Sequence, residues 1–257
     1  MRETTYPVRG CPFTIALLSD LHDSPFDRIA GSLSRHRPDI ICVPGDFVNA
    51  KKRPAQDVAA NAAHILPFFR MCAGIAPTFV SLGNHEWMLT LEDLACIRST
   101  GVIVLENRFV HFETAVIGGL SSSLYTCYQR DIVQAGQQEQ YPYPRAAGIT
   151  AAMPPETDWL EDFSVQPGFR LLLCHHPEYY PLYLQTLELS LVLSGHAHGG
   201  QIRLFGRGLY APGQGVFPRL TDGVHYRCFA ISRGLSNTSL VPRLWNPPEI
   251  VYITPNE

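Results

Sequence analysis

The chain lacks the features that mark several large protein classes. Its 257 residues carry a formal net charge of −3, and this slight acidity gives no indication of a surface for nucleic-acid backbones. Its apolar runs are shorter than the roughly 18 residues that a membrane-spanning helix requires, so we predict no transmembrane segment. The seven cysteines are odd in number and form no C-x-x-C pair, a pattern typical of reduced thiols. We therefore expect a cytoplasmic protein, with peripheral attachment to a membrane as an open alternative.

What is present is the composition of an ordinary globular protein, with 46% hydrophobic and 17% charged residues. Short apolar runs recur along the chain, and a polar cluster follows each of them. Runs of this length predict strands that are buried on both faces. They lie at residues 13–18, 40–43, 78–82, 171–174 and 189–193.

Segments of helical composition separate these runs. They are residues 55–72, with a break near Pro67, then 91–99 and 178–187. A short helix over 159–163 is expected to be capped by Thr157 or Asp158. The alternation of strands and helices predicts an α/β fold.

Two segments depart from this alternation. Residues 121–155 are rich in Ser, Gln, Tyr and Pro without clean periodicity, so we expect a long surface connection that is either a lid or a solvated insertion. The second segment, residues 204–226, contains five glycines and two prolines. Its apolar side chains either line a substrate cleft or pack internally; they are Phe205, Leu209, Tyr210, Phe217 and Leu220.

The polar residues that close the predicted strands share one chemical character, because most of them carry carboxylate, amide or imidazole groups. They occur as Asp20-Leu21-His22, Gly45-Asp46, Gly83-Asn84-His85-Glu86, His175 and Gly195-His196-Ala197-His198. In open α/β sheets, ligands bind just beyond the carboxyl ends of the strands, so these segments should meet at one place. Since they span positions 20 to 198, two independent domains would separate the site. We therefore expect residues 1–257 to form a single domain.

The spacing within the segments is compatible with metal binding. Residues two apart in an extended segment point the same way, so Asp20 and His22 can reach one ion, as can His196 and His198. A lone D-x-H or G-D is common by chance. The combination, in this order and at the ends of predicted strands, is specific.

This combined string resembles the calcineurin-like metallophosphoesterases over nearly the full chain. The GHxHGGQ stretch that begins at Gly195 is similar to a bacterial subgroup that includes membrane-associated phosphoesterases and a UDP-diacylglucosamine pyrophosphatase. The resemblance implies two mixed β-sheets in a sandwich flanked by helices. It also implies hydrolysis of a phosphodiester, phosphomonoester or pyrophosphate bond in a small-molecule or lipid-linked substrate. Substrate-binding residues cannot be assigned from the pattern.

The resemblance further implies a site for two divalent metal ions. One ion would be held by Asp20, His22, Asp46 and His198, and the other by Asp46, Asn84, His175 and His196. Asp46 would then bridge the pair. Oxygen and imidazole ligands without a thiolate favour Mn²⁺, with iron or zinc as alternatives. Asn49 occupies the position at which purple acid phosphatases carry a tyrosine, so a ferric tyrosinate centre is not expected.

Charge and proton transfer complete the sequence-based mechanism. Two divalent ions outweigh the two carboxylates of Asp20 and Asp46, so the site stays cationic and can bind phosphate. A metal-bridging hydroxide would attack the phosphorus. His85 should point away from the ions and act as general acid or as a hydrogen-bond donor to phosphate, with Glu86 orienting it.

The other histidines and two other functions are less compatible with the sequence. Because adjacent residues of a strand point to opposite sides, only one of His175 and His176 should face the metals, and the family pattern selects His175. The remaining histidines match no element of the string and are expected to be structural or at the surface; they are His36, His64, His111 and His225. A catalytically silent scaffold of the same fold is the alternative function. A metallopeptidase or lactamase is disfavoured, because H-E-x-x-H and H-x-H-x-D-H are absent.

Overall fold

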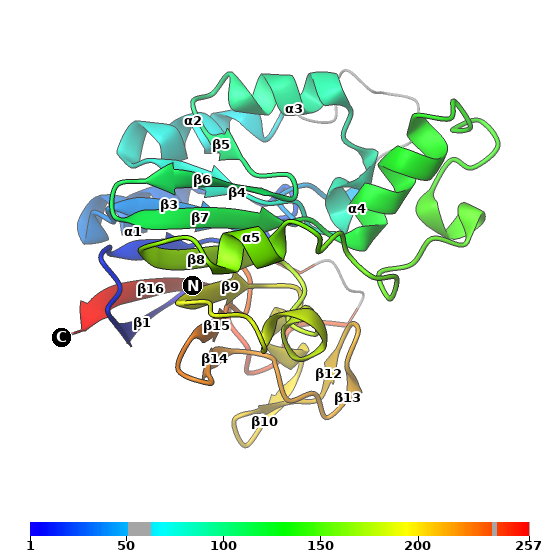
Figure 1. The fold of residues 1–257 in the computed structure, drawn as a ribbon. Coiled ribbons are helices and arrows are strands. Elements are labelled where there is room, and N and C mark those ends of the chain that lie inside the picture. Colours follow the sequence, from blue (N-terminus) through cyan, green and yellow to red (C-terminus); the bar gives the residue numbers. More distant parts are fainter. Residues whose placement is uncertain (51–62, 238–240, 257) are drawn as a thin grey trace.

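Two mixed β-sheets of six strands each dominate the fold. The structure is a computed structural model that describes residues 1–50, 63–237 and 241–256. Helices cover the outer face of each sheet (Figure 1). The α/β architecture predicted from the sequence, with two mixed sheets flanked by helices, is confirmed.

The first sheet has the order β1-β16-β2-β3-β4-β5. Its neighbours β2 to β5 run parallel, β1 pairs parallel with β16, and β16 pairs antiparallel with β2. The strands are β1 (Arg2–Arg9), β2 (Ile15–Leu17), β3 (Ile40–Val43), β4 (Thr78–Val80), β5 (Ile103–Val104) and β16 (Glu249–Asn256).

The second sheet has the order β14-β15-β9-β8-β7-β6, with antiparallel strands at both edges and parallel ones between them. Its strands are β6 (Arg108–Phe112), β7 (Ala115–Leu120), β8 (Phe169–Cys174), β9 (Leu191–Ser194), β14 (Gly223–His225) and β15 (Phe229–Ile231).

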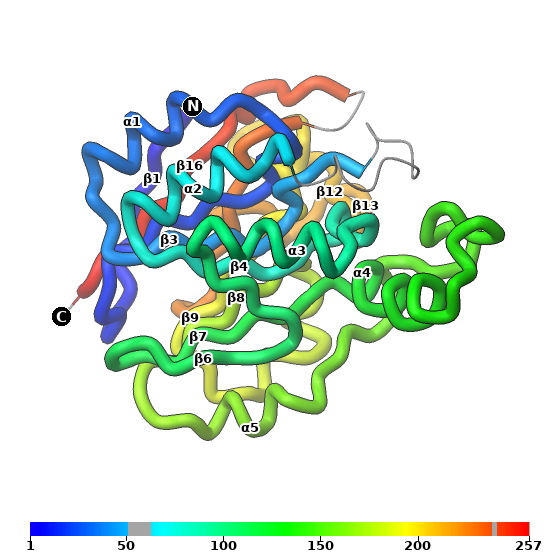
Figure 2. The backbone as a smooth tube through the Cα atoms, turned by 90° about the horizontal axis from the view of Figure 1, so that it is seen from above, coloured from blue at the N-terminus to red at the C-terminus, as the bar shows by residue number. Residues whose placement is uncertain are grey.

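Side-chain alternation along the strands divides the core into layers. Leu17 of β2 and Leu171 of β8 meet in the cluster between the sheets, whereas Ala16 belongs to the cluster beneath the helices of the first sheet and Leu172 to the outer cluster of the second. Helices α1 (Asp27–His36), α2 (Leu66–Ile75) and α3 (Leu91–Arg98) lie over the first sheet (Figure 2). The second sheet is covered by α5 (Leu160–Ser164) and a π-helical turn, η6 (Tyr180–Leu184). Strands β2, β3, β4 and β9 are thus buried on both faces, as their apolar runs predicted.

The helix predictions need three corrections. The helix predicted over 55–72 is confirmed only from Leu66, where α2 begins, and residues 63–65 form a turn instead. Pro67 stands in the first turn of α2, where its missing N–H would have no partner anyway. The predicted part at 55–62 lies outside the described residues. In place of the helix predicted over 178–187, the structure has the π-helical turn η6. The expected cap at Thr157 or Asp158 is wrong. Trp159 is the N-cap residue of α5, and no side-chain hydrogen bond caps this helix.

The segment 121–155 is not a connection without structure. It contains α4 (Ser123–Tyr128), the π-helical turn η4 (Gln129–Val133) and the 3₁₀ turn η5 (Pro144–Ala147). Cys127, Tyr128, Ile132 and Ile149 form its own small core. Each helix is too short to give a readable period, which is why composition alone suggested a loop.

Two small hairpins follow the second sheet's β9 strand at one end of the molecule (Figure 1). One joins β10 (Arg203–Leu204) to β11 (Arg207–Gly208), and the other joins β12 (Tyr210–Ala211) to β13 (Gly215–Val216). In the part of the chain that the structure describes, no helix combines the length and apolar character needed to cross a membrane.

Candidate metal centre

The seven predicted ligands lie at the carboxyl ends of five strands, β2, β3 and β4 of the first sheet and β8 and β9 of the second. Their ligand atoms form two groups within 4.8 Å of one another, Asp20 with His22 and His198, and Asp46 with His175 and His196. Apart from the half-buried Asn84, all are buried. Each group contains three of the four ligands that the resemblance implied for one ion, without Asp46 in the first and without Asn84 in the second. Two further groups of the same kind join His85 to His22 and Asp46, and His176 to Glu178 and His196.

Asp46 links the groups. Its Oδ2 lies 3.1 Å from Nε2 of His175 and 3.7 Å from Nε2 of His22. Asp20 Oδ1 is 3.5 Å from Nε2 of His198. Asn84 lines the same pocket, and its Oδ1 is buried without a hydrogen-bond partner among the described residues.

The backbone that delivers these groups is not extended. Asp20, His22, Asp46, His196 and His198 have φ values of 56°, 46°, 53°, 64° and 45°. This left-handed conformation is uncommon for residues other than glycine, and such strain concentrates at functional sites. The extended geometry expected for these two pairs is therefore wrong. Asp20 and His22 nevertheless belong to one group, whereas His196 and His198 belong to different groups.

Glycines allow the loops to approach closely. A Cβ on Gly83 would lie 2.4 Å from Oδ1 of Asp46, and one on Gly45 would lie 2.4 Å from the backbone nitrogen of Gly83. A Cβ on Gly195 would meet the side chain of Ser19 at 1.8 Å. No other residue type fits these positions without displacing a ligand.

Backbone carbonyls orient two of the imidazoles. Nδ1 of His22 lies 3.2 Å from the Val48 carbonyl, and Nδ1 of His198 lies 3.2 Å from the Ser236 carbonyl. With Nδ1–H donating to these oxygens, Nε2 of each ring is left free to face the carboxylates. Arg243 donates to the same Ser236 carbonyl, and the side chain of Ser236 donates to the Asp20 carbonyl.

Glu86 has a different role from the one expected. Its carboxylate accepts hydrogen bonds from the backbone amides of Gly83 at 2.7 Å, Asp46 at 2.8 Å and Val48 at 3.2 Å. It therefore holds the loops after β3 and β4 together. Burial and the neighbouring Asp46 raise the pKa of Glu86 to about 8.

The buried imidazoles differ in their proton affinity. Burial lowers the pKa of His22 to about 3 and lowers the pKa values of His196 and His198. Burial also opposes the charge of His175, but the adjacent Asp46 carboxylate outweighs it and raises the pKa of His175 to about 9. Three of the four rings are thus neutral at pH 7, the form that ligates a metal.

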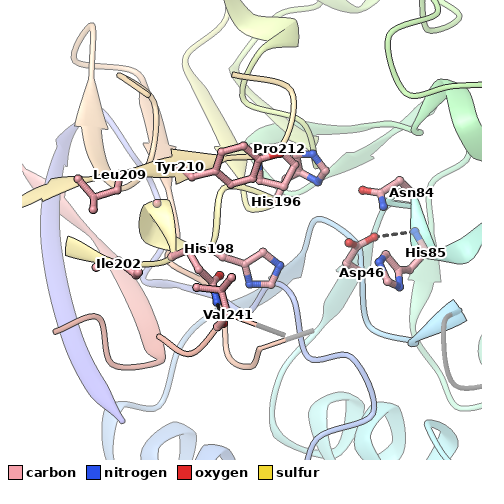
Figure 3. A pocket seen from close by; sticks show the side chains of 12 residues that line it. Asp46, Asn84, His85, His196, His198, Ile202, Leu209, Tyr210, Pro212 and Val241 are labelled. Atoms are coloured by element: carbon pink, nitrogen blue, oxygen red, sulfur yellow. Dashed lines mark hydrogen bonds between the residues drawn. The ribbon is translucent and has the colours of Figure 1, made fainter. Parts of the chain in front are cut away.

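His85 stands beside the two groups. Its backbone amide donates to Asp46 Oδ1 at 2.8 Å, as Figure 3 shows. The amide of Ala50 donates to Nδ1 of its ring at 3.1 Å. The neutral ring consequently carries its proton on Nε2, and the side chain lines the pocket.

The adjacent His176 turns away from Asp46. Its Nε2 lies 2.8 Å from Oγ of Ser122, and its Nδ1 lies 3.2 Å from Oε1 of Glu178. The planes of the His175 and His176 rings differ by 84°. Both rings also lie close to His196, since Nε2 of His175 is 3.2 Å from its Nδ1 and the centroid of the His176 ring is 4.3 Å from that of His196. Which of the two neighbours is a ligand stays a prediction.

The centre opens into a cavity of about 440 Å³ with two unlike halves. Figure 3 shows Asp46, Asn84 and His85 on one side, with Ile202 and Leu209 on the other. Tyr210, Pro212 and Val241 complete the apolar half. Of the apolar residues in 204–226, Leu209 and Tyr210 thus line the cavity, Leu220 is buried, and Phe205 and Phe217 are exposed.

Other residues of the site left no sequence signal. Ser236 and Val48 act through their carbonyl oxygens, which every residue possesses, and Arg243 lies 45 positions beyond His198 in the sequence. Ser122 sits in the segment that was expected to be a connection. The four unassigned histidines lie elsewhere: His36 contacts Glu3, His64 contacts Asp23, His225 contacts the Asp222 carbonyl, and His111 belongs to β6.

Comparisons with known proteins agree with this geometry. The family model for calcineurin-like phosphoesterases matches residues 13–200, a span that contains all seven candidate ligands. The uncharacterized metallophosphoesterase YkoQ of Bacillus subtilis (strain 168) is 27% identical over 252 residues, covering 91% of this chain and 80% of that protein. Phosphodiesterase YaeI of Escherichia coli (strain K12) is 28% identical over 206 residues, covering 76% of this chain and 64% of that protein.

Proposed function

Because the chain belongs to the calcineurin-like phosphoesterases, which are phosphoric ester hydrolases, we propose that it acts with two divalent metal ions held at the centre described above. The position of Asp46 carries this proposal, since one carboxylate oxygen lies between an imidazole of each group. The proposed ligands are Asp20, His22, Asp46, Asn84, His175, His196 and His198.

The chemistry of the donor atoms fits this assignment. Nε2 of His22 and Oδ1 of Asn84 are buried without hydrogen-bond partners among the described residues, and such atoms are costly unless a ligand satisfies them. Two divalent ions would also neutralise the buried carboxylates of Asp20 and Asp46. Oxygen and imidazole donors favour Mn²⁺, with iron or zinc as alternatives.

When bound, the ions would supply Lewis acidity and would lower the pKa of a coordinated water toward roughly 7, which would make that water a nucleophile toward phosphorus. Asp20 and Asp46 remove only part of the metal charge, because Asn84 and the imidazoles are neutral ligands, and this leaves the cavity attractive to phosphate. The reacting phosphate then lies against the polar half of the cavity.

His85 is proposed to assist the leaving group. Nε2 is the position that holds its proton, because Ala50 donates to Nδ1. Nε2–H donates to the leaving oxygen, and a full proton transfer requires the imidazolium form, which gives up the bond from Ala50. General acid catalysis of this kind contributes about 10²- to 10⁴-fold in rate.

The apolar half of the cavity supports a substrate with an apolar portion beside its phosphate. Ile202, Leu209 and Val241 give that portion an apolar surface to pack against. A small-molecule or lipid-linked phosphate ester meets this description, whether the scissile bond is a monoester, diester or pyrophosphate. The enzyme is proposed to work as one domain over residues 1–257 in the reducing cytoplasm, in keeping with seven free cysteines.

A metal-reconstituted activity screen tests the proposal. Chelation should abolish hydrolysis of bis-p-nitrophenyl phosphate, and Mn²⁺ should restore it best. Parallel assays with a monoester and a nucleotide-sugar lipid then identify the bond that is cleaved. Full activity in excess chelator would contradict metal dependence, whereas metal binding without turnover of any ester would favour the silent scaffold.

A further inference from the structure

Three aromatic side chains project from the loops that surround the apolar half of the cavity. Phe205 is fully exposed at the end of the β10–β11 hairpin, and Trp245 and Phe217 are each 72% exposed. The backbone amide of Arg203 donates to the Leu244 carbonyl at 3.1 Å, which places Trp245 beside this hairpin. We call Leu204, Phe205, Val216, Phe217, Leu244 and Trp245 the apolar rim; all six are exposed.

The backbone of the three aromatic residues is unfavourable for their side chains. Phe205, Phe217 and Trp245 have φ values of 49°, 52° and 53°, a region that a bulky residue rarely adopts. At the β10–β11 turn both central residues, Phe205 and Gly206, have positive φ, as in a type I′ turn that favours asparagine followed by glycine. An asparagine would suit both the turn and the solvent better. Folding therefore does not explain the aromatic side chains, and an external partner does.

The charge around the apolar rim is positive although the whole chain is acidic. Residues 199–221 contain three arginines and no Asp or Glu, and Arg207 and Arg219 are exposed. A hollow of about 410 Å³ lies beneath Phe205 and Trp245, lined also by Arg2, Arg203 and Arg233. Asp222 and Glu249 pair with these arginines, which leaves three guanidinium groups against two carboxylates.

We propose that the apolar rim docks on an anionic phospholipid bilayer, with the aromatic side chains among the lipid headgroups and the arginines against the phosphates. Aromatic side chains flanked by arginine are the combination that binds the interface of an anionic membrane. A second copy of the chain fits less well, because a two-fold contact would set arginine-rich surfaces against each other without acidic partners. The β10–β11 hairpin of the rim begins directly after Ile202 and ends directly before Leu209, and both of these residues line the cavity. A bilayer bound at the rim would therefore lie close to the apolar half of the cavity.

Vesicle co-sedimentation tests this surface directly. Wild-type protein should sediment with mixed phosphatidylcholine and phosphatidylglycerol vesicles, less with phosphatidylcholine alone, and less as salt rises. Phe205→Asn and Trp245→Asn should each weaken binding by about tenfold. Leu91→Gln is the matched control, since Leu91 is 75% exposed at the start of α3, far from the rim, and it should leave binding unchanged.

Two outcomes overturn the proposal. The first is that the wild type does not bind anionic vesicles, or that the double variant Phe205→Asn/Trp245→Asn binds them equally well. The second is that the wild type is a dimer in solution and the double variant is a monomer. Hydrolysis of bis-p-nitrophenyl phosphate should be the same in the double variant and the wild type. If neither the wild type nor the variants hydrolyse this ester, the result counts against the proposed function and not against docking. Vesicle binding is measured without turnover.

Discussion

At the scale of single residues, the neighbours His175 and His176 provide a matched pair. His175 faces Asp46 at 3.1 Å, whereas His176 faces Ser122 and Glu178. We expect His175→Ala to lose about one metal ion per chain and nearly all activity. His176→Ala should keep both ions and affect substrate binding at most. Metal analysis of the two purified variants decides, and the reverse pattern would show that the strand register is wrong by one residue.

His85 permits a test of its proposed proton transfer. His85→Ala should leave the metal content nearly intact, because its ring is not among the proposed ligands. The rate constant kcat should fall by about 10²- to 10⁴-fold for an alkyl leaving group and by less for p-nitrophenol, which leaves without a proton. Steady-state kinetics with both leaving groups provide the measurement. Equal losses would assign His85 to phosphate binding alone.

For single residues, the sequence predicted the chemistry of the site better than its backbone conformation. Asp20, Asp46 and His198 could be predicted to lie together because each follows an apolar run and carries a donor atom. Their left-handed backbone conformation could not be predicted from the sequence, since it depends on contacts with distant loops. The acceptors Val48 and Ser236 contribute carbonyl oxygens, and no side-chain pattern reports those.

At the scale of secondary-structure elements, the loop after β4 packs closely against the loop after β3 at Gly83. Gly83→Ala should displace Asp46, because the added Cβ would lie 2.4 Å from Asp46 Oδ1 and 2.7 Å from its backbone nitrogen. The expected result is loss of metal and a free energy of unfolding lower by roughly 1–3 kcal/mol. Denaturant unfolding and metal analysis are the measurements.

Gly74 gives the matched control for this change, because it lies within α2 and an added Cβ meets nothing within 4 Å. Gly74→Ala should keep the metals and stabilise the helix by up to about 1 kcal/mol. A Gly83→Ala variant with normal metal content would mean that the two loops can separate without affecting the centre.

The predicted apolar runs were confirmed as strands, but runs of similar length at β7 and β16 were not recognised. The apolar runs at 40–43 and 171–174 became β3 and β8, because strands buried on both faces need only hydrophobic residues. The remaining strands were not predicted; they are β1, β5, β6, β7, β14, β15, β16 and the hairpin strands β10 to β13. β1 is mostly exposed and polar, and it is ordered by pairing with β16 from the other end of the chain.

At the scale of the whole molecule, the metal centre lies between two sheets that share one core. Leu17 of the first sheet and Leu171 of the second pack in the same cluster, and the proposed ligands come from strand ends of both sheets. Fold class could be predicted because the order of apolar runs constrains topology. The apolar half of the cavity could not be predicted, since Leu209, Tyr210 and Pro212 reach it only through the packing of short hairpins.

This arrangement predicts that the metal-free protein unfolds in a single cooperative transition and that metal raises its midpoint. Neither sheet can expose its inner face without exposing that of the other, so the two should melt together. Metal binds only the folded centre, and saturation at a hundredfold excess over Kd adds about 2.7 kcal/mol to the free energy of unfolding. Calorimetry with and without Mn²⁺ measures both effects, and His175→Ala should show a smaller increase with metal. Two separate transitions in the metal-free protein would contradict a single domain, because each sheet would then be stable without the other.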